Sequence, residues 1–588
     1  MRPSSRRFAA APISVLLLGL SFGAAAAAPA APTSLTLQPC EVPGVARKVR
    51  CGSLEVFENR TLQTGRRIPL KILVLPATGS DRTADPLVFL EGGPGAAATE
   101  DAPGFAQEFA RILERRDILL VDQRGTGGSH PLNCTLFAPA DRLESYLGEF
   151  FPLEGVKRCR PELERGSDLK RYTTPIAADD LDEVRAALGY EKLNLFGVSY
   201  GTRAALVYLR RHGAHVRTVT LLGVSPTDQD IPLRFPVDTE RSLDGVLAEC
   251  AADPACHAAF PDPKGDLRAA LARLKADPAT VEIVHPETGA PTTVRLSRDV
   301  AAEAIRYMLY APESARHIPA VVHAAAAGDL APITEIALYT RQHIVSSGSN
   351  GLYLSVTCAE DLPWIRPDEA ERLAAGTMLG DYRYREQRAD CAVWPRAGLP
   401  IGYRLPVHSK VPVLIVSGAW DPVTPPSNGT AVAKSLSRSL HVVVPHGGHS
   451  LEGLVGADCI GRLEADFIER GSAAGLDTRC VARIERPPFA TEVLPAAPVA
   501  LGESQLRKLA GVYATGDSTE ARLEPSGSRL RLTISGGETL ILVPVSQDRF
   551  RVAGEPLSVF RFELEGESVR KAVLENWGTV EMTLTPKR

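Results

Sequence analysis

Strand-like apolar runs alternate with amphipathic segments through much of the chain. Largely apolar runs of strand length occur at 86–90, 117–121, 193–198 and 216–224. Helical patterns lie between such runs, and the segment 179–189 opens on acidic residues and closes on a glycine, as a capped helix does. This alternation predicts an α/β fold in which a mostly parallel sheet carries helices on both faces.

The strand rhythm stops before residue 230 and returns at 411–420 and 439–448. The intervening stretch is rich in alanine and in helical patterns. An insertion between two strands of one sheet is placed to cover the ends of the strands. The pattern therefore predicts a core at 32–229, a helical cap at 230–405, and a second core segment at 406–486.

The C-terminal part has a different character. Residues 487–500 are rich in proline and alanine, the composition of a linker. Short alternating runs separated by turn residues then fill 501–588. They predict a small all-β module, either a barrel or a sandwich.

Residues 1–31 have the pattern of a secretory signal peptide. Three early arginines precede the apolar run 8–22, and small residues follow at 24–31. The apolar run is too short to span a bilayer, so the pattern predicts cleavage rather than anchoring. We expect a periplasmic or secreted protein without stable membrane insertion.

The cysteine count agrees with export. An oxidising compartment favours disulfides, and pairing sequence neighbours closes the shortest loops, although sequence alone leaves the connectivity open. The ten cysteines then pair as Cys40/Cys51, Cys134/Cys159, Cys250/Cys256, Cys358/Cys391 and Cys459/Cys480. Their spacing contains no zinc-binding pattern, so we expect no metal site.

Composition narrows the range of partners. The chain is 44% apolar and 23% charged, as in ordinary globular proteins, and its formal net charge is −4. With no basic cluster, nothing favours a nucleic-acid partner. The pattern calls for no cofactor, and it leaves the oligomeric state open.

Ser199 is the strongest candidate for a nucleophile. It lies in Gly197-Val198-Ser199-Tyr200-Gly201, between a strand-like run and a helical one. A strand-to-helix elbow exposes the serine hydroxyl above the sheet, and the two glycines remove side chains that would collide there. The alternative is a serine that merely caps the helix.

A serine nucleophile needs a base and an acid that orients the base. Asp421 and His449 follow the last two predicted strands in the order Ser, acid, His that this architecture requires. His446 is the rival base, but Gly447-Gly448 lets the loop turn His449 inward. Asp228 is the rival acid.

Backbone amides complete the expected machinery. Glu91-Gly92-Gly93-Pro94-Gly95 follows an early strand, where such a sheet places one donor of the oxyanion hole. The amides of Gly93 and Tyr200 are the expected donors. A second glycine-rich loop begins at Asp122, and its Arg124 is a candidate for bracing the site through buried ion pairs.

Taken together, EGGPG, DQRGTGGS, GVSYGT and DPVTP…GGHS resemble the prolyl aminopeptidase and tripeptidyl aminopeptidase group of α/β-hydrolases. The resemblance spans about residues 50–485 and implies that Ser199, Asp421 and His449 form the catalytic triad. Prolyl aminopeptidases usually carry histidine where this chain has Glu91, which fits the secreted, tripeptidyl branch better. The module after residue 500 lies outside the match and resembles the lipocalin-like tails of some secreted hydrolases.

The resemblance also implies acidic side chains that hold the α-amino group of a substrate. Glu360 and Asp361 in the cap, together with Glu91, are the candidates; for the first two, surface acids without a role are the alternative. We therefore expect an aminopeptidase acting on free peptide N-termini. A carboxylesterase with the same machinery and a non-catalytic binding protein on a hydrolase scaffold are the alternatives.

Overall fold

The computed structural model describes residues 35–587, with gaps at 46, 138–141, 347, 493–497, 516–519, 536–538, 567 and 578. The predicted signal peptide at 1–31 lies outside these described residues. Within them, no helix has the length and apolar content needed to cross a lipid bilayer.

A nine-stranded sheet organises the core, in the order β1-β2-β3-β5-β4-β6-β7-β10-β11. The pairs from β1 to β5 are antiparallel, and all the pairs from β5 to β11 are parallel. The strands are β1 (Gln38–Cys40), β2 (Val49–Phe57), β3 (Arg67–Leu75), β4 (Leu87–Leu90), β5 (Ile118–Val121), β6 (Leu193–Val198), β7 (Val216–Leu222), β10 (Val413–Gly418) and β11 (Ser439–Val444). The predicted mostly parallel sheet is confirmed.

Helices cover both faces of this sheet, because neighbouring side chains of a strand point to opposite sides. In β10, Val413 and Ile415 belong to one apolar cluster, and Leu414 and Val416 belong to the other. The first face packs against α4 (Thr174–Ala187), α5 (Tyr200–His212) and α16 (Pro426–Ala433), and the second against α1 (Ala102–Glu108), α2 (Ala110–Leu113) and α17 (Asp458–Arg470).

One predicted helix begins earlier than its acidic residues indicate. The helix expected at 179–189 is α4, which begins at Thr174 with a proline in its first turn and ends at Ala187. Proline fits the first turn, since its missing N–H has no helical acceptor there. Gly189 follows with φ of +78° and lets the chain leave the helix.

The cap contains helices and one hairpin. Its helices are α6 (Phe235–Ala252), α7 (Pro254–Ala259), α8 (Pro263–Ala276), α9 (Arg298–Met308), α10 (Pro312–Ala315), α11 (Ile318–Ala327), α12 (Ala331–Ser346), α13 (Asn350–Glu360), α14 (Pro367–Ala374) and α15 (Tyr382–Val393). The antiparallel pair β8 (Ala279–Val284) and β9 (Pro291–Leu296) is an addition to the helix-rich pattern expected there. Helix α3 (Leu153–Glu164) comes from the earlier core segment but packs against α13 and α15.

The C-terminal module is a closed barrel rather than a sandwich. After α18 (Glu503–Leu509) its strands are β12 (Gly511–Ala514), β13 (Glu520–Ser526), β14 (Arg529–Ile534), β15 (Thr539–Pro544), β16 (Arg549–Val552), β17 (Glu555–Glu565), β18 (Ser568–Asn576) and β19 (Thr579–Pro586). Phe550, Phe560 and Phe562 pack together in its interior. Among the described residues each barrel strand pairs with two neighbours, which decides between the barrel and the sandwich that the alternating pattern left open.

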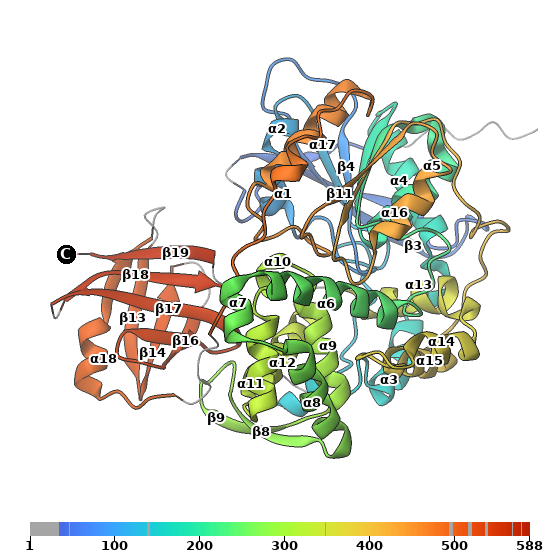
Figure 1. Cartoon of the computed structure of the whole chain (residues 1–588). Coiled ribbons are helices and arrows are strands. Elements are labelled where there is room, and N and C mark those ends of the chain that lie inside the picture. The colour runs from blue at the N-terminus through green and yellow to red at the C-terminus, as the bar shows by residue number, and fades with distance from the viewer. Residues whose placement is uncertain are drawn as a thin grey trace, which may run out of the picture.

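The barrel is attached to the cap. In Figure 1 the orange and red barrel lies beside the green and yellow cap helices. Leu557 and Trp577 of the barrel are buried in the apolar cluster of the cap, and the carbonyl oxygen of Trp577 lies 3.2 Å from Nε2 of His317. Arg551 pairs with Glu335 of α12 across the same interface. The C-terminal barrel, which the sequence separates from the cap by a linker-like segment, therefore shares an apolar core with the cap.

All five disulfides form between sequence neighbours, as the shortest-loop pairing predicts. Their two partners are 6 to 33 residues apart. Cys358–Cys391 joins α13 to α15 in the cap, and Cys134–Cys159 ties α3 to the loop after β5. Two of the five cross-links, Cys250–Cys256 and Cys358–Cys391, therefore lie within the cap.

We expect loss of Cys358–Cys391 to destabilise the protein more than loss of Cys250–Cys256. The first closes 33 residues and the second 6, so the loop-entropy model gives about 4 and about 2 kcal/mol. Thermal unfolding of the two double-alanine variants measures the difference. Equal melting temperatures for the two variants would contradict it.

Candidate active site

Ser199 stands at a sharp turn between β6 and α5. Its backbone has φ of 56° and ψ of −124°, a left-handed conformation that is strained for a non-glycine residue. A Cβ on Gly197 would lie 2.4 Å from the carbonyl oxygen of Gly201, and one on Gly201 would lie 1.9 Å from that of Leu90. Glycine is therefore required at both positions. Ser199 precedes α5 without a side-chain capping bond, so its hydroxyl is not used as a helix cap.

Asp421 and His449 meet at the end of the parallel sheet. Asp421 is fully buried, and its Oδ2 accepts a hydrogen bond of 2.9 Å from Nδ1 of His449. The Thr424 hydroxyl donates to the same Oδ2 at 2.6 Å and lies 3.0 Å from His449 Nδ1. With its Nδ1 proton held in this way, the imidazole presents Nε2 as a base.

The charge of Asp421 is maintained despite burial. Burial opposes ionisation, but the neighbouring His449 and the hydrogen bonds from His449 and Thr424 outweigh it and lower the pKa of Asp421. Backbone N–H groups of Val423 and Thr424 each donate to Oδ1 at 2.8 Å. An ionised, fixed carboxylate is what the orienting acid of a serine hydrolase requires.

The rival residues point elsewhere. Nδ1 of His446 lies 2.8 Å from a carboxylate oxygen of Glu249 in α6. Asp228 is exposed, and its carbonyl oxygen accepts from Arg404. Neither belongs to the wall of the cavity described below, whereas His449 does.

The glycine-rich loop after β4 passes beside the serine. A Cβ on Gly92 would lie 3.2 Å from Ser199 Cβ and 3.7 Å from its Oγ. Gly93 has φ of +105°, which favours glycine at this position. In the part of the chain that the structure describes, the amides of Gly93 and Tyr200 donate no hydrogen bond, so both are available to an oxyanion.

Ser199 and His449 line one cavity of about 390 Å³, closed on one side by the cap. The core contributes Glu91 and Asp101 to its wall, in addition to the glycine-rich loop. The cap and the segment before α3 contribute aromatic and basic side chains, namely Phe150, Phe151, Phe235, Arg306, Tyr307, Tyr310, Tyr353 and Arg383. The ring of Tyr310 stands edge-on to His449, with 5.1 Å between ring centroids. The site is thus a pocket covered on one side and open on the other, which admits a small substrate or the end of a chain.

Glu91 is the predicted substrate-binding acid that does line the cavity. Its Oε2 accepts from the amide of Gly92 at 3.2 Å. Burial, helped by the nearby charge of Asp101, raises the pKa of Glu91 to about 7. This carboxylate therefore changes its charge near neutral pH.

Glu360 and Asp361 do not reach the cavity, which corrects their assignment to a substrate amine. Both are fully buried at the end of α13. Glu360 accepts from the amide and the hydroxyl of Thr174, each at 2.8 Å, and also from the hydroxyl of Tyr403. Asp361 accepts from Nη1 of Arg203 at 2.8 Å.

The physical reason is the buried guanidinium of Arg203, four residues after the serine. Arg203 is 1% exposed, and a charge at that depth must be paired. Glu360 and Asp361 supply this pairing, and Thr174 links Glu360 to the Tyr200 hydroxyl at 2.7 Å. The two acids therefore stabilise the helix that follows Ser199 by neutralising Arg203. Arg203 was not used in the prediction from sequence, although an arginine four residues after the nucleophile is a signal that buried acids are needed nearby.

Arg124 has a similar bracing role for the core. Its Nη2 donates to Asp180 of α4 at 2.8 Å, and its Nη1 donates to the carbonyl oxygens of Glu58 and Arg171 at 2.9 Å each. It is fully buried. It ties the loop after β5 to the helix that precedes β6.

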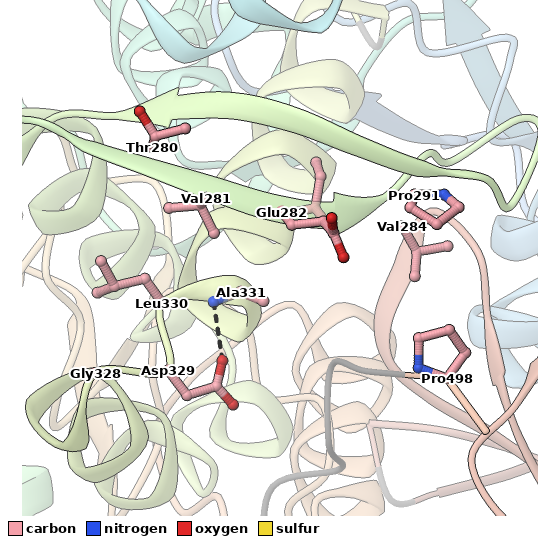
Figure 2. Close-up of a pocket in the computed structure, with 11 residues that line it drawn as sticks. Thr280, Val281, Glu282, Val284, Pro291, Gly328, Asp329, Leu330, Ala331 and Pro498 are labelled. Carbon is pink, nitrogen blue, oxygen red and sulfur yellow. Dashed lines mark hydrogen bonds between the residues drawn. The ribbon is translucent and has the colours of Figure 1, made fainter.

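A second hollow, of about 280 Å³, lies in the cap and is shown in Figure 2. Strand β8 forms one wall, and Asp329, whose carboxylate accepts from the amide of Ala331 at 3.2 Å, lies opposite. Pro498 of the linker closes one side. No residue of the Ser199 cavity lines this hollow, so we assign the chemistry to the first cavity.

A single group of described residues has ligand atoms close enough to hold a metal ion: Asp182, His212 and His215. Arg185 and the hydroxyl of Tyr208 already donate to Asp182 at 2.7 and 2.8 Å. These bonds occupy the carboxylate and place a positive charge beside it. We assign no metal to this group.

The fold and this site together define a serine hydrolase. The chain belongs to the alpha/beta hydrolase fold family, whose model matches residues 85–451. Sequence reasoning had missed Thr424, Asp101 and the cap residues of the wall. Thr424 had a local signal, since it follows the acid by three residues, whereas the cap residues come from helices far apart in sequence.

Characterised relatives include peptidases and an esterase. The chain is 27% identical over 456 residues to serine protease Hip1 of Mycobacterium tuberculosis, covering 70% of this chain and 85% of that protein. It is 26% identical over 507 residues to the tripeptidyl aminopeptidase of Streptomyces coelicolor, covering 78% and 88%. It is also 26% identical over 426 residues to carboxylesterase B of M. tuberculosis, covering 67% and 79%. The resemblance to the peptidases of this fold is thereby confirmed.

Proposed function

We propose that the protein is an exported serine aminopeptidase that removes residues or short peptides from free peptide N-termini. One observation carries the proposal: Glu91 and Asp101 line the same cavity as Ser199 and His449. A positively charged α-amino group is a natural partner for such carboxylates. The relatedness to a serine protease and to a tripeptidyl aminopeptidase supports a peptide substrate.

The first half of the reaction forms an acyl-enzyme. Ser199 Oγ attacks the carbonyl carbon of the substrate, and its proton passes to Nε2 of His449. Asp421 and Thr424 hold the imidazole from the Nδ1 side. The amides of Gly93 and Tyr200 donate to the oxyanion, a stabilisation of about 3–4 kcal/mol for each donor.

The second half releases the products. As the C–N bond breaks, His449 returns the proton to the departing amine, and the acyl group remains on Ser199. A water molecule then gives its proton to His449 and attacks the acyl carbon. Collapse of the second tetrahedral intermediate frees the N-terminal fragment and restores the serine hydroxyl.

Export is part of the proposal. Five disulfides are typical of proteins that fold in an oxidising compartment. The predicted signal peptide supports the same conclusion from sequence. The protein would therefore act on peptides in the periplasm or outside the cell.

A carboxylesterase is the second candidate, and the relatedness to carboxylesterase B favours it. The same machinery cleaves esters, so the acyl-transfer geometry does not separate the two activities. A non-catalytic binding protein is disfavoured by the strained serine and by the His449–Asp421 hydrogen bond, which are arranged for reaction.

The deciding experiment compares tripeptidyl amides that carry a free or an acetylated N-terminus. We expect kcat/KM to be at least about tenfold higher for the free amine, since a charge-assisted bond is lost on acetylation. The ratio should peak between about pH 7 and 8. Below pH 7 Glu91 becomes protonated, because its pKa is about 7, and above about pH 8 the amine loses its proton.

Glu91→Gln should flatten this pH profile and lower the ratio towards one. Glu100→Gln is the matched control, since Glu100 is an exposed acid on the same segment. Equal turnover of free and acetylated peptides at every pH, or turnover of esters alone, would refute the aminopeptidase.

A further inference from the structure

The cap wall of the catalytic cavity carries two buried arginines, and we propose that they form a subsite for a carboxylate of the substrate. Arg306 comes from α9 and Arg383 from α15, and both line the cavity that contains Ser199. They are 1% and 4% exposed. The inference rests on the proposed function and defines its substrate class: peptides with an acidic group.

The two guanidinium groups are short of acceptors. Glu303 is the carboxylate that faces both, with its Oε1 3.3 Å from Arg306 Nη1 and 3.9 Å from Arg383 Nε. Both cations thus contact this one anion, and Glu386 attracts Arg383 only from beyond ion-pair distance. Among the described residues, Nε of Arg306 and both Nε and Nη1 of Arg383 have no hydrogen-bond partner.

Aromatic rings hold the arginines in position. The guanidinium carbon of Arg306 lies 4.2 Å from the ring centroid of Phe235, and that of Arg383 lies 3.3 Å from that of Phe150. Nη2 of Arg306 also donates to the Tyr310 hydroxyl at 3.0 Å. Rings satisfy the faces of a guanidinium but leave its N–H edges to an acceptor. A carboxylate is the acceptor that matches this planar fork.

The cavity therefore has two charged regions of opposite sign. Glu91 and Asp101 come from the core, and Arg306 and Arg383 come from the cap. Tyr310, which accepts from Arg306, stands against His449, so one side chain separates Arg306 from the catalytic base. A short peptide with an ammonium group and a carboxylate complements both regions. Because both guanidinium groups are buried, charge-assisted bonds to them are stronger than such bonds are in water.

The carboxylate has two possible sources, an Asp or Glu side chain or the C-terminus of a short peptide. Matched peptides with Glu or Gln at each of the first four positions, each made as the amide and as the free acid, separate them. We expect kcat/KM to be at least about tenfold higher for one acidic member over its neutral counterpart. Preference among the amides identifies a side chain, and preference for free acids identifies the C-terminus. Equal rates throughout would overturn the subsite.

Variants assign the effect to the arginines. Arg383→Gln and Arg306→Gln should each lower the acidic-to-neutral ratio towards one. Arg341→Gln is the matched control, because Arg341 is also buried against Phe150 but lies outside the cavity wall, and it should keep the ratio of the parent. An unchanged ratio in both cavity variants would overturn the assignment. Thermal unfolding shows whether the variants fold. If neither does, the acidic-to-neutral ratio of kcat/KM for the parent protein decides whether the subsite exists.

The same peptides also test the subsite without peptide cleavage. Their inhibition of the hydrolysis of a small neutral ester reports binding in the cavity. If esters are cleaved and peptides are not, the aminopeptidase proposal fails, while at least about tenfold tighter inhibition by the acidic peptides still supports the subsite. Equal inhibition by acidic and neutral peptides would remove the subsite and leave the aminopeptidase standing.

Discussion

Replacing Ser199 by alanine is expected to lower kcat on peptide and ester substrates by about 10⁴-fold or more, and to abolish labelling by a fluorophosphonate probe. The expected loss is this large because removing the nucleophile leaves only the oxyanion hole and binding to act on the substrate. Turnover assays and mass spectrometry of the labelled protein provide the measurement.

Ser225→Ala is the matched control for this prediction. Ser225 is a buried serine that lines the same cavity, yet it does not stand on the strained elbow. It should keep both turnover and labelling. Labelling of Ser199→Ala at the rate of the parent would show that another residue is the nucleophile.

The second large effect is expected from Asp421→Asn, a substitution that preserves shape but removes charge. The amide no longer stabilises the imidazolium and favours the wrong tautomer of His449, which in the trypsin-type triad costs about 10⁴-fold in kcat. Steady-state kinetics on a neutral ester measures the loss in kcat separately from any change in KM. Melting temperatures show whether the fold is retained.

Asp228→Asn separates the two acids that the sequence left in competition. Asp228 follows β7 and is exposed, whereas Asp421 follows β10 and is buried beside His449. We expect Asp228→Asn to keep activity near that of the parent. A larger loss from Asp228→Asn than from Asp421→Asn would reverse the assignment of the acid.

These predictions depend on features that local sequence rules describe well. The turn around Ser199 has a signature within five positions: Gly197 is required by the carbonyl of Gly201, and Gly201 makes room for the carbonyl of Leu90 on the neighbouring strand. The disulfide pairs join residues at most 33 positions apart. The order of Ser199, Asp421 and His449 follows from the order of the strands. Patterns of this kind are short-range or are tied to chain order, so they can be read before folding.

The role of an acidic side chain, in contrast, cannot be predicted from its local sequence. Glu360 and Asp361 had the charge expected of an amine-binding pair, but the buried Arg203 claims both of them. Their partner lies more than 150 positions away along the chain. Burial depth and partner identity depend on which helices pack together, and no local pattern encodes that.

The hydrophobic pattern and the glycines of the chain specify an α/β core, a nucleophile elbow and a C-terminal β module, and the cysteine spacing indicates the disulfide pairing without fixing it. Folding in three dimensions determines the rest: closure of the barrel, its attachment to the cap, and the cavity that Glu91, Arg306 and Arg383 line together. The physical reason is the range of the interactions. Backbone conformation depends on near neighbours, whereas a pocket is made of side chains that only packing brings together.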